Sequence, residues 1–185
     1  SSRVLVSPDG NQIAACITSN SPTGQLTSSH RSLCVWRVQA DGSWEPSEVY
    51  QATLRLSAIN DLGMIVGSRT VKTVRQAFVW DPAHGFQMLG LLEGDESAEA
   101  LDVNNKGLVV GYSDDPHGPS GGPQAFIWKD GKLLALEFPL PTLYSSATTV
   151  TDSGMIGGFL QTSPDNESEA SKTLSFVFSM PKHLR

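Results

Sequence analysis

The densest group of potential metal or ligand contacts lies at residues 114–118, which read Asp-Asp-Pro-His-Gly. With Glu93, Asp95 and Glu96 before it, this run could offer carboxylate oxygens to Ca²⁺, which prefers hard oxygen ligands. The spacing matches neither an EF-hand nor a repeat-in-toxin loop, and acidic loops of this kind are usually only solvated. We therefore predict no metal and no cofactor, and keep these side chains as candidates for contact with a ligand.

The basic residues are scattered except for one small cluster, Arg69, Lys72 and Arg75. The chain has 13 Lys and Arg against 19 Asp and Glu, a net charge of −6. Binding to nucleic acid requires a dense basic surface, so this balance argues against it. The expected partner is a protein or a glycan of open identity. The candidate ligand-binding residues are Asp114, Asp115, His117, Glu93, Asp95, Arg69, Lys72 and Arg75.

Residues that could carry catalysis are few. The four histidines, at positions 30, 84, 117 and 183, are isolated from one another. No serine lies in a nucleophile elbow, and no histidine pair has the spacing of a zinc site. Propeller-type glycosidases use scattered carboxylates, so a carbohydrate-active hydrolase or lyase with a carboxylate in a central channel stays the alternative. Asp102 is the only clear candidate for that carboxylate, and we name no catalytic residue.

Three tryptophans, Trp36, Trp80 and Trp128, could form stacking platforms for sugars. A tryptophan on a strand with a phenylalanine two residues before it is more typical of a hydrophobic core. Phe78 and Phe126 have this position relative to the second and third tryptophans. We therefore predict that Phe78, Trp80, Phe126 and Trp128 are mostly buried.

These residues belong to a repeat that determines the architecture. The phrase Asn-Asp-Leu-Gly-Met-Ile-Val-Gly at 60–67 returns as Asn-Asn-Lys-Gly-Leu-Val-Val-Gly at 104–111 and, degraded, at 151–158. A fainter copy opens at Ser-Pro-Asp-Gly, residues 7–10, and an aromatic strand follows every copy. A period of about 40–50 residues with several strands in each unit is typical of propeller blades or related β-arrays.

Each copy divides into short strands joined by tight turns. In the second copy we predict strands at 56–60, 64–70, 76–80 and 86–92, and no segment shows a sustained helical period. The expected fold is all-β, a propeller-like array of about four antiparallel sheets with three or four strands each. We assign the whole chain, 1–185, to a single β-repeat domain. Its copies span about 3–54, 55–95, 96–143 and 144–180.

The boundaries of the sheets can be placed in a second way. Counting from the fourth strand of the preceding copy gives units at 48–80, 86–128 and 132–178, preceded by a three-stranded unit at 3–38. The array is then either a four-bladed ring with one incomplete blade or a part cut from a longer protein. We favour the self-contained ring.

Some recurring small and polar residues have a structural explanation. Glycine at 67, 111 and 158, with Ala15 in the first copy, fits either a close approach of a neighbouring backbone or ring, or a slot for any small residue. We favour the slot. The Asn and Asp residues at 60, 104 and 152 are expected to shape turns. Cys16 and Cys34 lie on neighbouring predicted strands. Buried free thiols are favoured there over a disulfide.

The phrase Asn-x-x-Gly-x-Val-Val-Gly, with Ala-Phe-x-Trp and Leu-Gly-x-Leu after it, resembles the HAF-repeat family of predicted bacterial extracellular repeats. The resemblance covers residues 56–138 and extends more weakly to about 178. The His of the family's His-Ala-Phe tripeptide is Gln76 in one copy and Gln124 in the next, so no role of that residue carries over. Residues 7–14 look more like blades of TolB-type and WD-like propellers. The family implies a secreted or surface-exposed bacterial protein and no known reaction.

In a meander the short turns lie at one end of the strands and the variable connections at the other. The variable connections are 19–31, 70–75, 93–97, 114–124 and 163–173. Variable loops on a rigid scaffold are where binding tends to occur. We therefore predict a non-enzymatic binding or adhesion module of a secreted or surface protein, with its ligand on the variable-loop face. No segment has the roughly 20 apolar residues that a membrane span requires.

Overall fold

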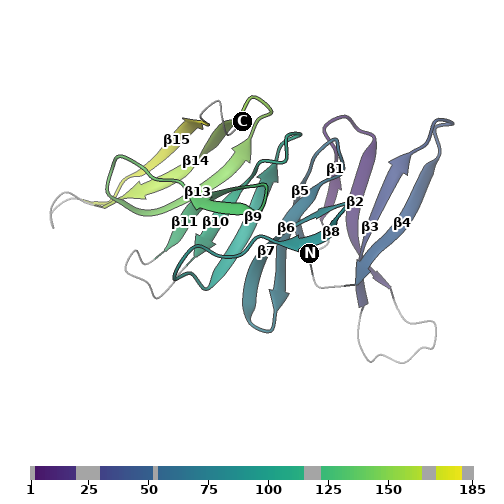
Figure 1. The fold of residues 1–185 in the computed structure, drawn as a ribbon, viewed down its shortest axis with the longest axis horizontal. Helices are drawn as coiled ribbons and strands as arrows, with labels where there is room; N and C mark the ends of the chain where they lie inside the picture. Colours follow the sequence, from purple (N-terminus) through teal and green to yellow (C-terminus); the bar gives the residue numbers. More distant parts are fainter. Residues whose placement is uncertain (1–2, 20–29, 52–53, 115–121, 164–169, 181–185) are drawn as a thin grey trace.

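The computed structural model describes residues 3–19, 30–51, 54–114, 122–163 and 170–180. These residues form fifteen strands in four antiparallel sheets and contain no helix. The sheets follow one another along the molecule, from purple at the N-terminus to yellow at the C-terminus (Figure 1). The strands are β1 (Val4–Val6), β2 (Gln12–Ser19), β3 (His30–Val38), β4 (Trp44–Gln51), β5 (Leu54–Ile59), β6 (Ile65–Val71), β7 (Val74–Asp81), β8 (Gly85–Met88), β9 (Ser97–Val103), β10 (Val109–Asp114), β11 (Pro123–Lys129), β12 (Lys132–Ala135), β13 (Thr142–Val150), β14 (Met155–Thr162) and β15 (Thr173–Ser179).

Each sheet is a meander, in which strands consecutive in the chain are also neighbours in the sheet. The first sheet is β1–β4, the second β5–β8, the third β9–β12 and the fourth β13–β15. This confirms the predicted all-β array of about four antiparallel sheets with three or four strands. The shifted units 48–80, 86–128 and 132–178 are wrong, because β4 pairs with β3 and β8 pairs with β7.

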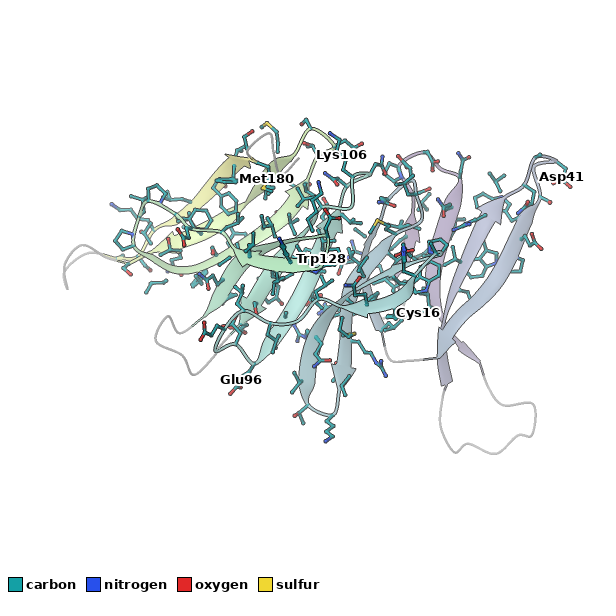
Figure 2. The ribbon with its side chains drawn as sticks, viewed as in Figure 1. Cys16, Asp41, Glu96, Lys106, Trp128 and Met180 are labelled. Carbon is teal, nitrogen blue, oxygen red and sulfur yellow. The ribbon has the colours of Figure 1, made fainter. Side chains whose placement is uncertain are left out.

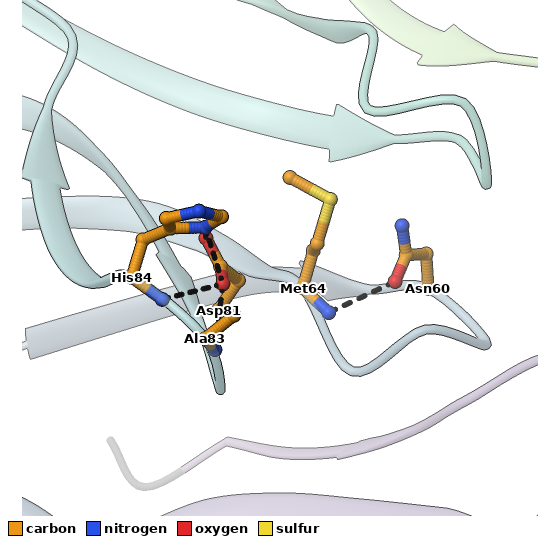
Figure 3. Close-up of polar contacts among 5 residues, drawn as sticks. All are labelled: Asn60, Met64, Asp81, Ala83 and His84. Atoms are coloured by element: carbon orange, nitrogen blue, oxygen red, sulfur yellow. Dashed lines mark hydrogen bonds and ion pairs between the residues drawn. The ribbon is translucent and has the colours of Figure 1, made fainter.

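A tight turn joins the first two strands of every sheet, and its shape follows from the recurring Asn and Gly. Gly63 has a φ of 81°, in the left-handed region that glycine occupies without strain. Asn60 Oδ1 accepts hydrogen bonds from the backbone N–H groups of Leu62 (3.0 Å) and Met64 (2.9 Å); Figure 3 shows the second of these. Asn104 makes the same two bonds in the third sheet.

Hydrogen bonds also join these turns from sheet to sheet, in a set of contacts that we call the turn ladder. The backbone N–H of Asp61 donates to Asn105 Oδ1 (2.9 Å), and that of Asn105 donates to Asp152 Oδ1 (2.7 Å). Asn60 Nδ2 donates to the carbonyl of Asn104 (2.8 Å). Asn104 Nδ2 makes the equivalent bond to the carbonyl of Thr151 in the fourth sheet. The sequence predicted only that these residues shape turns. The structure shows that they also hold neighbouring sheets together.

Three apolar cores lie between successive sheets. We call the face of a sheet that packs on the preceding sheet its back face, and the opposite one its front face. Phe78 and Trp80 lie on the back face of the second sheet, and Phe126 and Trp128 on that of the third. All four are buried, which confirms the prediction of a core role. Trp80 and Trp128 are therefore not exposed platforms for sugars.

The recurring glycine of the second strand lies opposite a register shift in the first strand, where an extra residue forms a bulge. A Cβ at Gly67 would overlap the carbonyl oxygen of Arg55, and one at Gly111 would overlap that of Glu99. At Gly111 it would also lie 2.9 Å from Cζ of Phe126. The favoured expectation of a slot for any small residue is therefore wrong. A close backbone approach requires glycine here.

The two cysteines do not form a disulfide. Cys16 is paired with Leu33 across β2 and β3, and Cys34 is paired with Ala15. Since directly paired residues share a face and successive residues alternate, the two sulfur atoms lie on opposite faces of the first sheet. Cys16 is buried in the core against the second sheet, which agrees with the favoured expectation.

The strands have two distinct ends. Lys106 and Asp41 lie in tight turns at what we call the turn end, along the upper edge of Figure 2, and Glu96 lies at the opposite, loop end. The β6–β7 hairpin also reaches the loop end (Figure 1). The first and fourth sheets lie at opposite extremes of the row, so the described sheets form an open row. The described sheets therefore do not close on themselves into the self-contained ring that we favoured.

Candidate functional site

At the loop end, a buried carboxylate gathers two arginines and a tyrosine from two sheets. Glu99 lies on β9 between two buried alanines, and its side chain is buried as well. Its Oε2 accepts hydrogen bonds from Arg75 Nη1 and from the Tyr112 hydroxyl, both at 3.1 Å. Its Oε1 lies 3.6 Å from Arg55 Nε. We call these four residues the Glu99 network.

The charges of this network do not cancel. A buried carboxylate requires paired donors, because its removal from water is costly. Both arginine side chains meet that requirement and still reach water, with 69% of Arg55 and 44% of Arg75 exposed. Burial, followed by the charge of Glu99, raises the pKa of the Tyr112 hydroxyl above its ordinary value, so the hydroxyl stays protonated and donates. Two guanidinium groups against one carboxylate leave one positive charge in excess, on side chains that are partly exposed.

The predicted acidic segment lies on the end of β10. The backbone N–H of Glu96 donates to the carbonyl of Asp114 (3.0 Å), and that of Leu92 donates to Ser113 Oγ (3.2 Å). Asp95 N–H closes a turn on the Leu92 carbonyl. These bonds bring the segment that contains Glu93 and Asp95 beside Asp114. Within the described residues, the half-buried Asp114 has no hydrogen-bond partner at Oδ1.

A hollow of about 350 Å³ lies next to Asp114 at the same end. Asp114 pairs with Pro123 across β10 and β11, and Pro123 lines the hollow together with Gln124, Phe138 and Tyr144. The hydroxyl of Ser145 accepts a hydrogen bond from Ala125 N–H (2.9 Å) and so fixes the start of β13 against β11. The hollow is thus formed between the third and fourth sheets.

The structure brings some of the predicted residues together and not others. Arg75 belongs to the Glu99 network, whereas Arg69 faces Gln76 along the β6–β7 hairpin and Lys72 lies at its exposed tip. Asp95 and Asp114 lie on one joined segment. The candidates Asp115 and His117, and most of the connections 19–31, 114–124 and 163–173, lie outside the described residues. The connections 70–75 and 93–97 both lie at the loop end.

Sequence reasoning missed Arg55, Glu99 and Tyr112. The available signal was a single charged residue inside the apolar run Ala98-Glu99-Ala100, which indicates a buried charge that needs a partner. The partners themselves come from strands that are distant in the chain. No local pattern identifies them.

Asp102, the carboxylate proposed for a channel enzyme, links two sheets instead. Its Oδ2 accepts hydrogen bonds from the Thr149 hydroxyl (3.0 Å) and the Val150 N–H (2.8 Å) of the fourth sheet. Its Oδ1 accepts one from the N–H of Val103 (2.9 Å). These donors give the carboxylate a structural role between the third and fourth sheets.

A larger groove, of about 840 Å³, lies at the turn end between the second and third sheets. Leu62, Met64 and Trp128 contribute apolar surface, and Arg37, Lys106, Asp81 and His84 contribute polar groups. In Figure 3 the paired Asp81 and His84 lie across from Met64.

Asp81 is held within its own turn. Its Oδ1 accepts hydrogen bonds from the backbone N–H of Ala83 (2.8 Å) and of His84 (2.9 Å), and lies 3.0 Å from Nδ1 of the imidazole. Partial burial opposes the charged form of Asp81, but these contacts outweigh it and lower the pKa of the carboxyl. The contacts of the Asp81–His84 pair therefore stabilise the turn itself, and no ligand is needed to account for them.

No metal or membrane element is found in the part of the chain that the structure describes. It contains no group of three His, Cys, Asp or Glu side chains placed to hold a metal ion. It also contains no helix with the length and apolar character needed to cross a membrane.

Solved structures similar to this chain share its fold. TolB from Acinetobacter baumannii superposes with a TM-score of 0.53 at 14% sequence identity, over 93% of this chain and 39% of TolB. The β-propeller domain of the Trilobed protease from Pyrococcus furiosus, described as having an open velcro topology, gives a TM-score of 0.57 at 15% identity. That match covers 98% of this chain and 57% of the other. This chain thus spans less than two thirds of either structure.

These similarities establish a propeller-like fold. They show nothing about function, because both sequence identities are low. No protein-family model matches the chain, and a search of curated proteins found no match. Membership of the HAF-repeat family therefore stays a prediction.

Proposed function

We propose that this chain is a non-enzymatic, β-propeller-like binding or adhesion module, and that its ligand contacts the loop end. The ligand class is a protein or glycan that carries a carboxylate or another acidic group. The chemistry follows from the Glu99 network, and the location from its position beside the acidic segment and the hollow at Asp114.

The observation that carries this proposal is the state of the two arginines. Glu99 fixes Arg55 and Arg75 on one side while large parts of both side chains stay in water. A planar guanidinium offers several N–H donors in a geometry that matches a carboxylate. Because the network already orders the two arginines, their side chains lose little conformational entropy when a ligand binds. An ordinary surface ion pair has both partners exposed, whereas here a buried carboxylate holds two partly exposed arginines.

The surroundings support a ligand larger than a single anion. The hollow of about 350 Å³ beside Asp114 has aromatic lining from Phe138 and Tyr144. Glu93 and Glu96 are exposed close to it and could contact basic groups or hydroxyls of the same ligand. The loop end therefore presents positive and negative groups at the second and third sheets, and a hollow with aromatic lining between the third and the fourth.

The cellular context is part of the proposal. The HAF-like phrases at 60–67 and 104–111 support a secreted or surface-exposed bacterial protein, in which a repeat module would display its loop end to a partner. The fold similarity to TolB and to the protease propeller is compatible with this role.

A glycan and protein array, read with the chain in solution, is the primary test. For each ligand found, Arg75→Ala and Arg55→Ala should each weaken affinity roughly tenfold, about 1.4 kcal/mol. Arg37→Ala is the matched control, since Arg37 is exposed at the turn end. Loss of binding in Arg37→Ala but not in the other two variants would instead place the site in the groove at the turn end. Denaturant midpoints check that all three variants are folded.

The competing function, a carbohydrate-active hydrolase or lyase, is tested beside it with a broad panel of substrates. Because the oxygens of Asp102 are bound by Thr149 and Val150, we expect no turnover that depends on this carboxylate. Turnover that Asp102→Asn abolishes in a folded protein would replace the binding proposal with the enzyme.

A further inference from the structure

In the part of the chain that the structure describes, the two outermost sheets each have one apolar face that no other sheet covers. Val4 and Trp44 are exposed on the back face of the first sheet, where they line a hollow of about 350 Å³ with Ile13, Ala15 and Trp36. This lining is almost entirely apolar. Trp36 occupies the repeat position of Trp80 and Trp128, which are buried by a preceding sheet.

The fourth sheet shows the complementary situation on its front face. Met155, Phe159 and Val177 are exposed there. Val177 holds the repeat position of Val79 in the second sheet, which is buried against the third. The fourth sheet therefore presents the surface type that elsewhere in the chain is covered by a back face.

The chain itself shows what these two faces fit. At each of its three internal interfaces, the front face of one sheet packs on the back face of the next. The two uncovered faces are the two halves of that same interface, carried at opposite extremes of one molecule (Figure 1). Both are apolar and of a kind that a soluble protein usually covers.

We propose that the front face of the fourth sheet packs on the back face of the first sheet of a second copy of this chain. Such a contact is heterologous, so two or more copies would either close into a ring or extend as a filament. The proposal does not depend on the ligand site at the loop end.

The turn ladder indicates that this contact is weaker than the internal ones. At the first residue of the turn, the side-chain amides of Asn60 and Asn104 each donate a hydrogen bond to a carbonyl of the next sheet. The fourth sheet has Thr151 at this position, which has no amide group to donate. At the second residue of the turn, side-chain oxygens such as those of Asn105 and Asp152 accept a hydrogen bond from a backbone N–H of the preceding sheet. The first sheet has Pro8 at this position, whose side chain cannot accept one. The contact between copies thus lacks two of the bonds found inside the chain and relies mainly on apolar packing. Its assembly should depend on protein concentration.

The test measures the mass of the 185-residue chain by light scattering and sedimentation over a wide range of concentration. We expect a mass that rises above the 19.8 kDa of one copy as concentration increases. Val4→Arg and Val177→Arg, at side chains that are 62% and 71% exposed, should each keep the protein folded and monomeric. Leu62→Arg is the control, because Leu62 is 61% exposed but lies at the turn end.

Mixing the two variants gives the sharpest outcome. A Val4→Arg copy keeps its front face and a Val177→Arg copy keeps its back face, so the mixture should form dimers and nothing larger. A parent that stays at 19.8 kDa at every concentration would overturn the proposal. A mixture that remains monomeric, variants that associate as the parent does, or a Leu62→Arg protein that loses association would also overturn it.

Discussion

The two middle sheets and the two end sheets are built from one repeat, yet equivalent residues have different surroundings. Trp80 and Trp128 are buried because a preceding sheet covers them, whereas Trp36, at the same position in the first sheet, is half-buried. Val79 is buried and Val177 is exposed for the corresponding reason at the other extreme. The role of a side chain in this fold therefore depends on its neighbouring sheet as much as on its place in the repeat.

The polar contacts follow the same rule. The middle turns accept and donate along the turn ladder, and Asn105 Nδ2 contacts both Asp61 (2.7 Å) and Asp152 (3.1 Å). In the first sheet Gln12 takes over a cross-sheet contact, with its Nε2 donating to the Asp61 carbonyl (2.7 Å). The Asp9 N–H also donates to Asp61 Oδ1 (2.7 Å). Each end sheet thus has polar links to a neighbouring sheet on one side only, and we expect stability to be concentrated in the middle of the row.

The largest expected effect contrasts two equivalent tryptophans. Trp80→Ala should reduce the free energy of unfolding by roughly 3–5 kcal/mol, because it leaves a cavity between the first and second sheets. Trp36→Ala should reduce it by roughly 1–2 kcal/mol, since much of that ring already contacts water. Denaturant unfolding measures both. Equal losses would contradict the distinction between middle and end sheets.

The second contrast uses glycines of two different sheets. Gly111→Ala should destabilise the fold by about 3 kcal/mol, since the new Cβ meets the Glu99 carbonyl and the Phe126 ring. Gly157→Ala, on the uncovered face of the fourth sheet, brings its Cβ within 3.0 Å of only a methyl of Thr149. That methyl is on an exposed residue and can move, so we expect a loss of about 1 kcal/mol. Thermal unfolding of both variants would show whether the order is reversed.

The third contrast concerns the turn ladder. Asn104→Ala removes two bonds within the turn and one to the fourth sheet, and leaves buried N–H groups without an acceptor, so we expect a loss of about 2 kcal/mol. Thr151→Ala removes only bonds within an exposed turn, and should reduce stability by about 0.5 kcal/mol. Hydrogen exchange at Lys106 and Leu108 should rise in the first variant alone. Unchanged exchange there would count against Asn104 Oδ1 as the acceptor that holds the turn.

Local sequence predicted the elements of this fold well, because its strands and turns depend on near neighbours. The glycine turns, the aromatic third strand and the buried Phe78 and Trp128 were all legible from one repeat. The phase of the sheets stayed open between two countings, because the pairing of β4 with β3 and of β8 with β7 depends on hydrogen bonds that a repeat count does not reveal.

The candidate site was less predictable for a related reason. Arg75 could be selected as part of a basic cluster, but its partner Glu99 lies on another sheet and appears in the sequence only as a charge among alanines. The turn ladder was hidden because the same Asn residues already have a sufficient role inside their own turns. Contacts between repeats require the relative placement of sheets, which a single repeat does not contain.

The smallest expected effect is the contribution of two turn carboxyls, Asp41 and Asp81, to stability. It arises inside single turns, so a middle sheet and an end sheet should behave alike. In the first sheet, hydrogen bonds from the Ser43 hydroxyl and then the Ser43 N–H lower the pKa of Asp41. In the second, partial burial opposes ionisation of Asp81, but the N–H groups of His84 and Ala83 and the imidazole outweigh it. A carboxyl whose pKa is lower in the folded protein stabilises the fold at pH values above the ordinary pKa of 3.8. This stabilisation is lost as the pH falls from 3.8 through the lowered pKa of the folded protein.

Asp41→Asn and Asp81→Asn should therefore each lower the denaturant midpoint slightly at pH 7, and the difference from the parent should disappear near pH 2. Because no neighbouring sheet takes part in either set of bonds, the two variants should follow the same pH profile. The measurement is denaturant unfolding of parent and variants at several pH values between about 2 and 7. A markedly larger effect of Asp81→Asn would show that the middle sheet stabilises its turn from outside, which would extend the contrast between middle and end sheets to contacts that the structure presents as local.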